Sequence, residues 1–217
     1  MNGRLKPLKK LPKLFKQIKN DSRFKKCETI NLYHQDESRF GLMTHIGKSL
    51  TARGVKPIVK YQHAFKNTYL YGSFSPINGD SFIWEIEGTD TKIFEAYLNA
   101  FSEYKPNELK LLIIDNAGFH STNNILVPDN IILINIPPYS PELNPSERIW
   151  GYLKQKYKNR VFETLENVKE WLHETIRNDL TEEKIKSMTH MGFYKTLFES
   201  HFKEQLILHL IRSILIF

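Results

Sequence analysis

Residues 111–120 read LLIIDNAGFH, and this stretch decides the fold. Four apolar residues in a row, two of them β-branched, are too few for a buried helix and predict a strand covered on both faces. The strand ends at Asp115, and ligands of open α/β sheets bind beyond the carboxyl ends of strands. Taken alone, Asp115 is better explained as part of a polar turn, because Asp, Asn and Gly are common turn residues.

A second acid closes another predicted strand. Residues 30–37 alternate so that Asp36 lies on the same face as the apolar side chains before it, while Glu37 points to the other face. We expect Asp36 at the end of this strand. It is either a turn residue or a partner of Asp115 at the edge of the sheet.

A third acid follows a rigid, proline-rich loop at residues 137–145. Asn144 as N-cap and Pro145 at the first helical position predict a helix that runs to about Arg160. Glu147 then lies in the first turn. The spacing of Asn144 and Glu147 also matches a capping box, and spacing alone favours that structural role for Glu147.

The three acids suggest metal chemistry if they meet. Parallel neighbouring strands would place Asp36 beside Asp115, and a helix packed over that edge would add Glu147. Three clustered carboxylates repel and need cations among them. Their hard oxygen atoms favour Mg²⁺ or Mn²⁺, and two such ions can activate a water or a 3′-hydroxyl against a phosphodiester. The chain has no Cys/His spacing of a structural zinc site.

The remaining pattern predicts one α/β domain. Strand-like runs cover residues 54–61, 68–74 and 81–86, and Asn78-Gly79 predicts a hairpin between the last two. Residues 89–91 cap a helix, residues 131–136 form a further strand, and Thr164 and Thr181 begin two more helices. The order of these elements predicts a mixed sheet flanked by helices.

Charge is concentrated at the front of the chain. Residues 1–26 hold ten Lys/Arg and one acid, net +9, while the remainder holds 21 Lys/Arg and 23 Asp/Glu, net −2. Apolar residues recur at helical spacing between the lysines. This basic helix either lies on a nucleic-acid backbone, through Lys9, Lys10, Lys13 and Lys16, or docks on the domain with its basic face in solvent.

Composition limits the protein class. The single Cys27 excludes a disulfide framework, and the sequence shows neither a signal-peptide pattern nor an apolar run of membrane-spanning length. We expect a cytoplasmic, nucleoid-associated protein that does not enter a membrane. The apolar tail, residues 201–217, is too short to span a bilayer and is expected to pack on the domain or on a second copy.

Three sequence blocks together resemble the catalytic motifs of mariner-like DDE transposases, and more narrowly of the bacterial insertion-sequence branch. The blocks are Asp36-Glu37-Ser38, residues 115–120 (DNAGFH) and residues 138–150 (PYSPELNPSERIW). The resemblance covers roughly residues 28–195.

The resemblance implies a ribonuclease H-like fold with a DDE triad of Asp36, Asp115 and Glu147. In that family the triad binds two divalent ions, Mg²⁺ or Mn²⁺, cuts DNA at element ends and joins the freed 3′-hydroxyl to target DNA. Asn116, His120 and Asn144 match motif positions and are expected to support the triad. Lys154, Lys158 and Arg160 follow Glu147 and are candidates for DNA contact, with a solvated helix face as the alternative.

The departure from the family concerns the front of the chain. Family members usually carry helix-turn-helix units before the catalytic domain, and residues 1–27 are too few for such a pair. We therefore divide the chain into a basic arm or linker helix (1–27), a catalytic domain (28–200) and an apolar tail (201–217). A homodimer or a partner chain would supply recognition of the element ends. The rival hypotheses are a truncated, non-catalytic remnant that binds DNA or pairs with full-length transposase, and a stand-alone nuclease.

Overall fold

The computed structural model describes residues 11–48, 51–56, 58, 60–115, 125–136 and 141–215, without the side chains of residues 24, 25, 141 and 204–215. The strands are β1 (Thr29–Gly41), β2 (Asn67–Phe74), β3 (Ser81–Ile86), β4 (Glu108–Ile114) and β5 (Ile131–Asn135). The helices are α1 (Leu11–Lys19), α2 (Ser22–Lys26), α3 (Thr91–Glu103), η4 (Pro141–Leu143), α4 (Ser146–Tyr157), α5 (Leu165–Asp179), α6 (Glu182–Thr189) and α7 (Gly192–Leu215).

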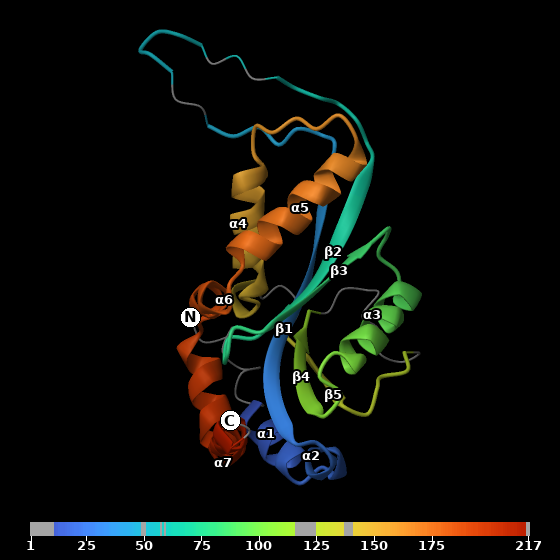
Figure 1. Cartoon of the computed structure of the whole chain (residues 1–217), viewed down its shortest axis with the longest axis vertical. Coiled ribbons are helices and arrows are strands. Elements are labelled where there is room, and N and C mark those ends of the chain that lie inside the picture. Colours follow the sequence, from blue (N-terminus) through green and yellow to red (C-terminus); the bar gives the residue numbers. More distant parts are fainter. Residues whose placement is uncertain are drawn as a thin grey trace.

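The strands form one mixed sheet in the order β3-β2-β1-β4-β5 (Figure 1). β1 is central. It pairs antiparallel with β2 on one side and parallel with β4 on the other, and β5 continues the parallel half. The predicted class, an α/β fold with a mixed sheet flanked by helices, is confirmed.

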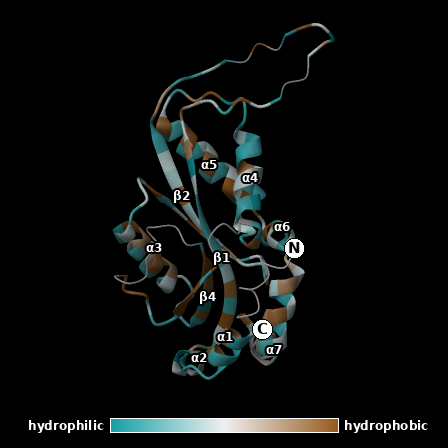
Figure 2. Ribbon diagram, turned by 180° about the vertical axis from the view of Figure 1, so that it is seen from behind, coloured by the Kyte–Doolittle hydropathy of each residue, from teal (hydrophilic) through white to brown (hydrophobic). Residues whose placement is uncertain are grey.

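Helices cover both faces of the sheet. On one face, α1 and α7 pack on the half formed by β4, β5 and the start of β1, and α4, α5 and α6 pack on the half formed by β2 and the end of β1. On the other face, α3 packs against a second cluster of buried side chains. Every residue of β4 is buried, and Figure 2 shows this strand as mostly hydrophobic. Coverage of both faces explains its nearly continuous apolar sequence.

Local signals in the sequence fix several elements. Asp90 caps α3 by accepting a hydrogen bond from the Ile93 N–H, and Thr164 and Thr181 cap α5 and α6 in the same way. The predicted hairpin joins β2 to β3. Its Gly79 has φ = 85°, a left-handed conformation that glycine adopts without strain.

Two predictions about strands were wrong. Residues 54–61 form no strand where the structure describes them; they belong to a long connection between β1 and β2. In addition, β1 continues five residues beyond Asp36, to Gly41. The reason is its partner: β2 pairs with β1 as far as Gly41 and Asn67, whereas the pairing of β4 with β1 ends at His34.

The first and last described helices pack together. Phe15 of α1 is fully buried and contacts the rings of Phe198 and Phe202 on α7, at centroid distances of 6.5 and 5.5 Å. α7 is continuous across the predicted boundary at residues 200 and 201, and the division of the chain into three parts stays a prediction. Among the described helices, none combines the length and apolar character needed to cross a bilayer.

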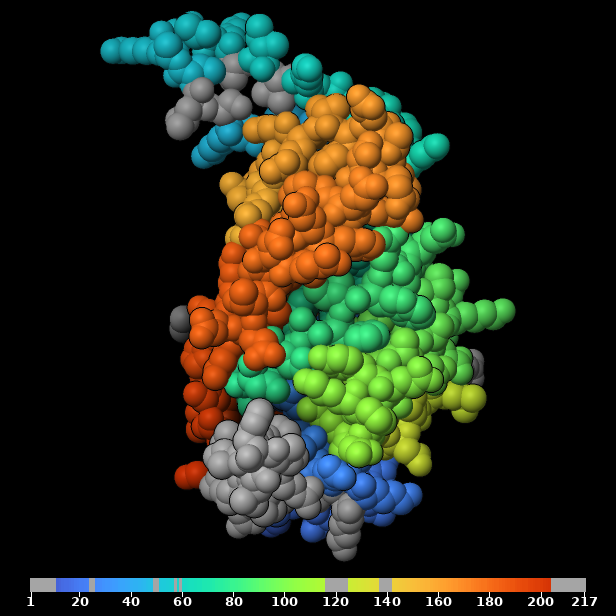
Figure 3. Space-filling view, viewed as in Figure 1, coloured from blue at the N-terminus to red at the C-terminus, as the bar shows by residue number. Residues whose placement is uncertain are grey.

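We call the connection between β1 and β2, residues 42–66, the arm. It projects from the end of the molecule formed by α4 and α5 (Figures 1 and 3). Its base is attached to the residues after α4, because the Asn159 N–H donates to the His45 carbonyl at 2.9 Å and the Asn159 side chain accepts from the Gly47 N–H at 2.8 Å. Large apolar side chains of the arm are exposed, with Ile58 at 99% and Phe65 at 71%.

Candidate active site

The sheet brings the two aspartates together. β1 and β4 run parallel, and their last paired residues are His34 and Ile113. The same register carried two residues further places Asp36 opposite Asp115, just after β4 ends. Side chains alternate between the two faces of a strand. By this alternation Asp36 and Asp115 lie on the face of the sheet that packs against α4 and α7, so both carboxylates belong to one face. Asp36 thus lies where β4 leaves the side of β1, although β1 itself goes on.

The start of α4 is attached to β1 beside Asp36. Ser146 Oγ donates to the His34 carbonyl at 2.8 Å, and Asn144 Nδ2 donates to the Gln35 carbonyl at 2.9 Å. Ser146 and Asn144 are both buried. These two hydrogen bonds hold the first turn of α4, which carries Glu147, over the face on which Asp36 lies.

A glycine lets α4 approach the sheet. Gly72 pairs with Asp36 across β1 and β2. A Cβ at this position would lie 2.8 Å from Trp150 on α4 and 2.6 Å from Phe74, closer than carbon atoms approach. The Trp150 ring therefore packs in the space that a larger side chain at position 72 would fill. Its centroid lies 5.3 Å from that of Phe74.

The capping-box alternative for Glu147 does not match the structure. Asn144 Oδ1 accepts from the Ser146 N–H at 3.2 Å, and α4 begins at Ser146 with Pro145 in the cap position and no side-chain cap. The prediction of Asn144 as N-cap and Pro145 as first helical residue was wrong by one residue, because the Asn144 side chain also bonds to β1. Glu147 is exposed on the first turn of α4.

Electrostatics link the three acids. Burial is the main reason that the pKa of Asp36 rises to about 8, and the charges of Glu37, Asp115 and Glu147 contribute to the same rise in that order. The neighbouring His34 cannot compensate, because it is completely buried and burial lowers its pKa to about 3. Asp36 therefore carries its negative charge at neutral pH only at a cost that a nearby cation would remove.

The three carboxylates have the right chemistry to bind a divalent ion, but their spacing in this structure is too wide to hold one. Carboxylates from Asp36, Asp115 and Glu147 are the hard oxygen ligands that Mg²⁺ and Mn²⁺ prefer. The raised pKa of Asp36 shows that their charges act on one another. Within the described residues, however, no three His, Cys, Asp or Glu side chains are grouped closely enough to hold an ion.

The supporting residues divide into two groups. Asn144 is buried beside Asp36, as described above, whereas Asn116 and His120 lie outside the described residues. The sequence reasoning missed Ser146 and Gly72. Ser146 stands inside the proline-rich motif, so its place there was a usable signal, but the role of Gly72 depends on its neighbours in space.

The predicted DNA-contacting residues lie at two ends of the molecule. Lys9 and Lys10 fall outside the described residues, and Lys13 and Lys16 are exposed on α1. At the other end, Lys154 is half-buried on α4, and Lys158 and Arg160 are exposed just after that helix. The Arg160 guanidinium lies 5.0 Å from the centre of the Trp171 ring, and Lys158 Nζ donates to Gln155 Oε1 at 2.8 Å.

Comparison with known proteins agrees with this architecture. The model of the DDE superfamily endonuclease family matches residues 31–169, which include Asp36, Asp115 and Glu147. The chain therefore belongs to the DDE superfamily endonucleases. It is also 32% identical, over 102 residues, to the uncharacterized protein y4pE/y4sA of Sinorhizobium fredii (strain NBRC 101917 / NGR234), covering 46% of this chain and 76% of that protein.

Solved structures identify the fold more closely. The Mos1 transposase paired-end complex with left transposon end superposes with a TM-score of 0.60 at 17% identity, over 94% of this chain and 63% of that one. The Mos1 mariner paired-end complex with Mn gives a TM-score of 0.58 at 18% identity, over 94% and 63% of the two chains. The chain therefore has the ribonuclease H-like fold of the Mos1 transposase. The chain spans about 63% of the length of these Mos1 chains.

Proposed function

We propose that this chain is the catalytic domain of an insertion-sequence transposase, which cuts DNA at the element ends in a divalent-metal-dependent reaction and joins the freed 3′-hydroxyl to target DNA. One observation carries the proposal most directly. The family's three acids sit on adjoining strands and on a helix attached to the same strand, and their charges jointly raise the pKa of Asp36. Membership of the DDE endonuclease family supports the reaction class.

The chemistry proceeds in two displacements. In the first, a water oxygen attacks the scissile phosphorus and the bond to the 3′-oxygen breaks, which leaves a 3′-hydroxyl and a 5′-phosphate. In the second, that 3′-hydroxyl attacks a phosphorus of the target strand and displaces another 3′-oxygen. Both nucleophiles must lose a proton, and both leaving oxygens must gain one.

The residues of the chain position these reactants. Asp36 and Asp115 present carboxylates from one edge of the sheet, and the hydrogen bonds of Ser146 and Asn144 to β1 fix the first turn of α4, which carries Glu147. These three carboxylates would hold Mg²⁺ or Mn²⁺, as one or two ions. Such an ion supplies Lewis-acid activation of the nucleophile and of the leaving oxygen.

The proposal is tested by nicking of DNA that carries the element ends, in Mg²⁺ or Mn²⁺. Asp115→Asn should reduce nicking at least about 100-fold, because even outer-shell changes at metal sites commonly cost 10–100-fold. Asp129→Asn, an exposed acid in the turn before β5, is the matched control and should keep wild-type activity. Unchanged nicking by Asp115→Asn would refute the assignment.

The same assay separates the rival hypotheses. A transposase prefers DNA with the element ends, whereas a stand-alone nuclease cuts DNA without them equally well. A non-catalytic remnant nicks neither substrate and gains no stability from the metal. We further propose that the protein acts on DNA together with a second copy or a partner chain, since the Mos1 structures are complexes with paired transposon ends.

A further inference from the structure

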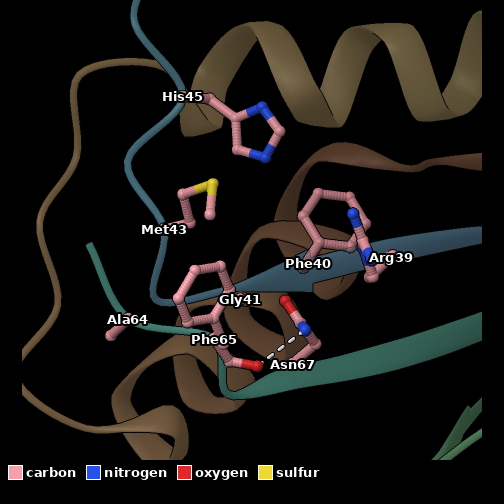
Figure 4. A pocket seen from close by; sticks show the side chains of 8 residues that line it. All are labelled: Arg39, Phe40, Gly41, Met43, His45, Ala64, Phe65 and Asn67. Atoms are coloured by element: carbon pink, nitrogen blue, oxygen red, sulfur yellow. Dashed lines mark hydrogen bonds between the residues drawn. The ribbon is translucent and has the colours of Figure 1, made fainter. Parts of the chain in front are cut away.

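A pocket lies at the base of the arm, away from the three acids. Its volume is about 250 Å³, and its eight lining residues come from the end of β1, the two ends of the arm and the start of β2. In Figure 4 their side chains surround a common space. They are Arg39, Phe40, Gly41, Met43, His45, Ala64, Phe65 and Asn67.

The lining combines flat apolar groups with positive charge. Phe40, Met43 and Phe65 supply the apolar surface, and Phe65 is 71% exposed although it is a large aromatic side chain. Arg39 and His45 are the ionisable members, and none of the eight lining residues is acidic. An aromatic ring beside cations is the combination by which proteins hold unstacked nucleotides.

Further cations converge on the pocket from α4. Partial burial lowers the pKa of the His45 imidazole, and the charges of Lys154, Arg39 and Lys158 lower it further. Three positive side chains therefore lie near His45, two of them from the end of α4. A phosphate group beside His45 would be attracted by all three charges.

The pocket also has a defined floor. Gly41 pairs with Asn67 across β1 and β2, and a Cβ at Gly41 would lie 2.2 Å from Asn67 Oδ1 and 2.5 Å from the Lys66 carbonyl. The Asn67 amide is held in place because Nδ2 donates to the Phe65 carbonyl at 2.9 Å. Its oxygen is thus positioned as a fixed polar group, of the kind that can bond the edge of a base.

Two rigid elements connect the pocket with the acids. Arg39 follows Asp36 by three residues on β1, about 10 Å at roughly 3.3 Å per residue, which corresponds to about three nucleotide steps of one B-form strand. α4 runs from Glu147 to the base of the arm, where Tyr157 Oη donates to the Gly41 carbonyl. The pocket therefore stays at a fixed, short distance from the proposed cleavage point.

We propose that this pocket binds one unpaired nucleotide of the DNA, with its base against Phe65 and Met43 and its phosphates near Arg39, Lys154 and Lys158. The volume is below the roughly 300–1,000 Å³ of pockets for drug-sized ligands, so the pocket would hold the base while the sugar and phosphates stay outside it. The inference rests on the proposed function, because it assumes that DNA is the substrate. It adds to that function a binding place for one base, next to the cleavage point and outside the duplex.

The test compares two duplexes in EDTA at a fixed salt concentration, with binding followed by fluorescence anisotropy. One duplex carries a single-nucleotide bulge, and the other carries an abasic analogue at the same place. The wild-type protein should bind the bulged base about tenfold more tightly, as expected for one base stacked on an aromatic side chain. Phe65→Ala should remove this preference.

Two further variants make the result specific. Tyr61→Ala truncates another exposed aromatic residue of the arm that does not line the pocket, and it should keep the preference. Lys158→Gln should weaken binding to both duplexes equally, because a phosphate contact does not depend on the base. Circular dichroism of each variant confirms that it is folded.

The outcomes separate this inference from the proposed function. Equal binding of the two duplexes by the wild type would overturn the pocket proposal and leave the transposase proposal intact. Absence of any DNA binding would overturn both. If Phe65→Ala keeps the base preference but changes the oligomeric state in sedimentation, the pocket binds protein rather than a nucleotide, and the proposal is wrong. Because EDTA prevents cleavage, a catalytic failure cannot affect these measurements.

Discussion

At the scale of single residues, the surroundings of Asp36 disfavour its charged form. Its carboxyl is largely buried, three other carboxylates raise its pKa, and His34, two residues before it on β1, is neutral. A protein keeps such a group when its charge is needed for function. We therefore expect a bound metal ion, rather than the side chains around Asp36, to stabilise its negative charge.

Metal-linked stabilisation is therefore expected for the wild type. Mg²⁺ or Mn²⁺ at about 100 times its Kd should raise the free energy of unfolding by about 2.7 kcal/mol. Asp36→Asn should lose most of this gain, because it removes one charged ligand. Thermal unfolding with and without metal measures the difference, and Asp129→Asn should respond like the wild type. An equal gain for Asp36→Asn would show that Asp36 is not a ligand.

A second group of buried ionisable residues lies at the other end of β1. The Tyr33 hydroxyl is 2.6 Å from Asp80 Oδ2 and 2.7 Å from Glu108 Oε1. Asp80 also accepts from Tyr104 and Lys105; burial would raise its pKa, but these donors and Tyr33 keep it below its ordinary value. Burial raises the pKa of Glu108. The Tyr33 hydroxyl thus bridges two carboxylates, and the raised pKa of Glu108 favours its protonated form.

Glu108 therefore makes stability depend on pH. Its folded pKa lies above its unfolded value near 4.5, so its contribution is complete below that pH and is lost as the pH rises through the folded pKa. Its contribution therefore gives the free energy of unfolding a negative slope against pH above about pH 4.5. Glu108→Gln should remove the Glu108 part of this slope.

Urea unfolding at several pH values gives the measurement. The measurements should stop below pH 8. Burial lowers the pKa of Lys110 to about 8, and the titration of Lys110 would add the opposite slope above that value. Glu103→Gln, on an exposed acid at the end of α3, is the control and should keep the wild-type slope. Identical slopes for the wild type and Glu108→Gln would contradict the raised pKa of Glu108.

At the scale of elements, the attachment of α4 to β1 determines the site. Two side chains before and at the start of α4, Asn144 and Ser146, donate to consecutive carbonyls of β1 just before Asp36. These carbonyls lie at the point where β1 is losing β4 as a partner. The helix thus replaces hydrogen bonds that the sheet no longer supplies, and at the same place it brings Glu147 near the aspartates.

Ser146→Ala should therefore weaken both stability and cleavage. Loss of the donor leaves the buried His34 carbonyl without this partner and should cost about 1–3 kcal/mol. Nicking at a temperature where the variant is fully folded should fall further than folding explains, because Glu147 is less well positioned. Ser200→Ala, whose hydroxyl bonds within α7 to the Leu197 carbonyl, is the matched control. Full activity of Ser146→Ala would contradict the positioning role.

Local chemistry in the sequence predicted the elements that depend on local contacts. The caps at Asp90, Thr164 and Thr181 fixed three helix starts, and the Asn78-Gly79 turn fixed the hairpin. The alternation of residue types along β1 correctly predicted that Asp36 lies with the apolar side chains before it, on the face opposite to the one that packs against α3. These features follow from neighbours within a few residues along the chain.

Features that depend on distant partners could not be predicted in this way. The apolar residues of 54–61 look strand-like, but no neighbouring strand pairs with the described ones, and they remain in the arm. The extension of β1 depends on β2, and the role of Gly72 depends on Trp150 from α4. The participation of Asp36, Asp115 and Glu147 in catalysis was predicted from motif order and stays a prediction.

At the scale of the whole molecule, positive charge lies at both ends of the long axis. Lys13, Lys16 and Lys19 are exposed on α1, and Lys158 and Arg160 are exposed just after α4; these two helices lie toward opposite ends of the molecule (Figure 1). α1 matches the docking alternative raised by the sequence, since it packs on α7 through Phe15 and keeps its lysines in solvent. DNA contact through these lysines stays a prediction, and it would use a different face of the helix from the docking.

Variants on the two faces should behave differently. Phe15→Ala should destabilise the protein by about 3–5 kcal/mol, as for other large core truncations. Lys13→Gln with Lys16→Gln should leave stability within about 0.5 kcal/mol but reduce the salt dependence of DNA binding by about two phosphate contacts. Chemical unfolding and DNA titrations at several salt concentrations measure the two effects. An unchanged salt dependence would leave α1 with a docking role alone.

The packing of α1 on α7 also has a consequence for biosynthesis. Phe202, the partner of Phe15, is translated about 190 residues after it. At roughly 5–20 residues per second, this part of the core stays open for about 10–40 s. Until then the apolar side of the first helix is available to chaperones, and a message cut short before the last helix yields a chain that cannot close its core and is directed to proteolysis.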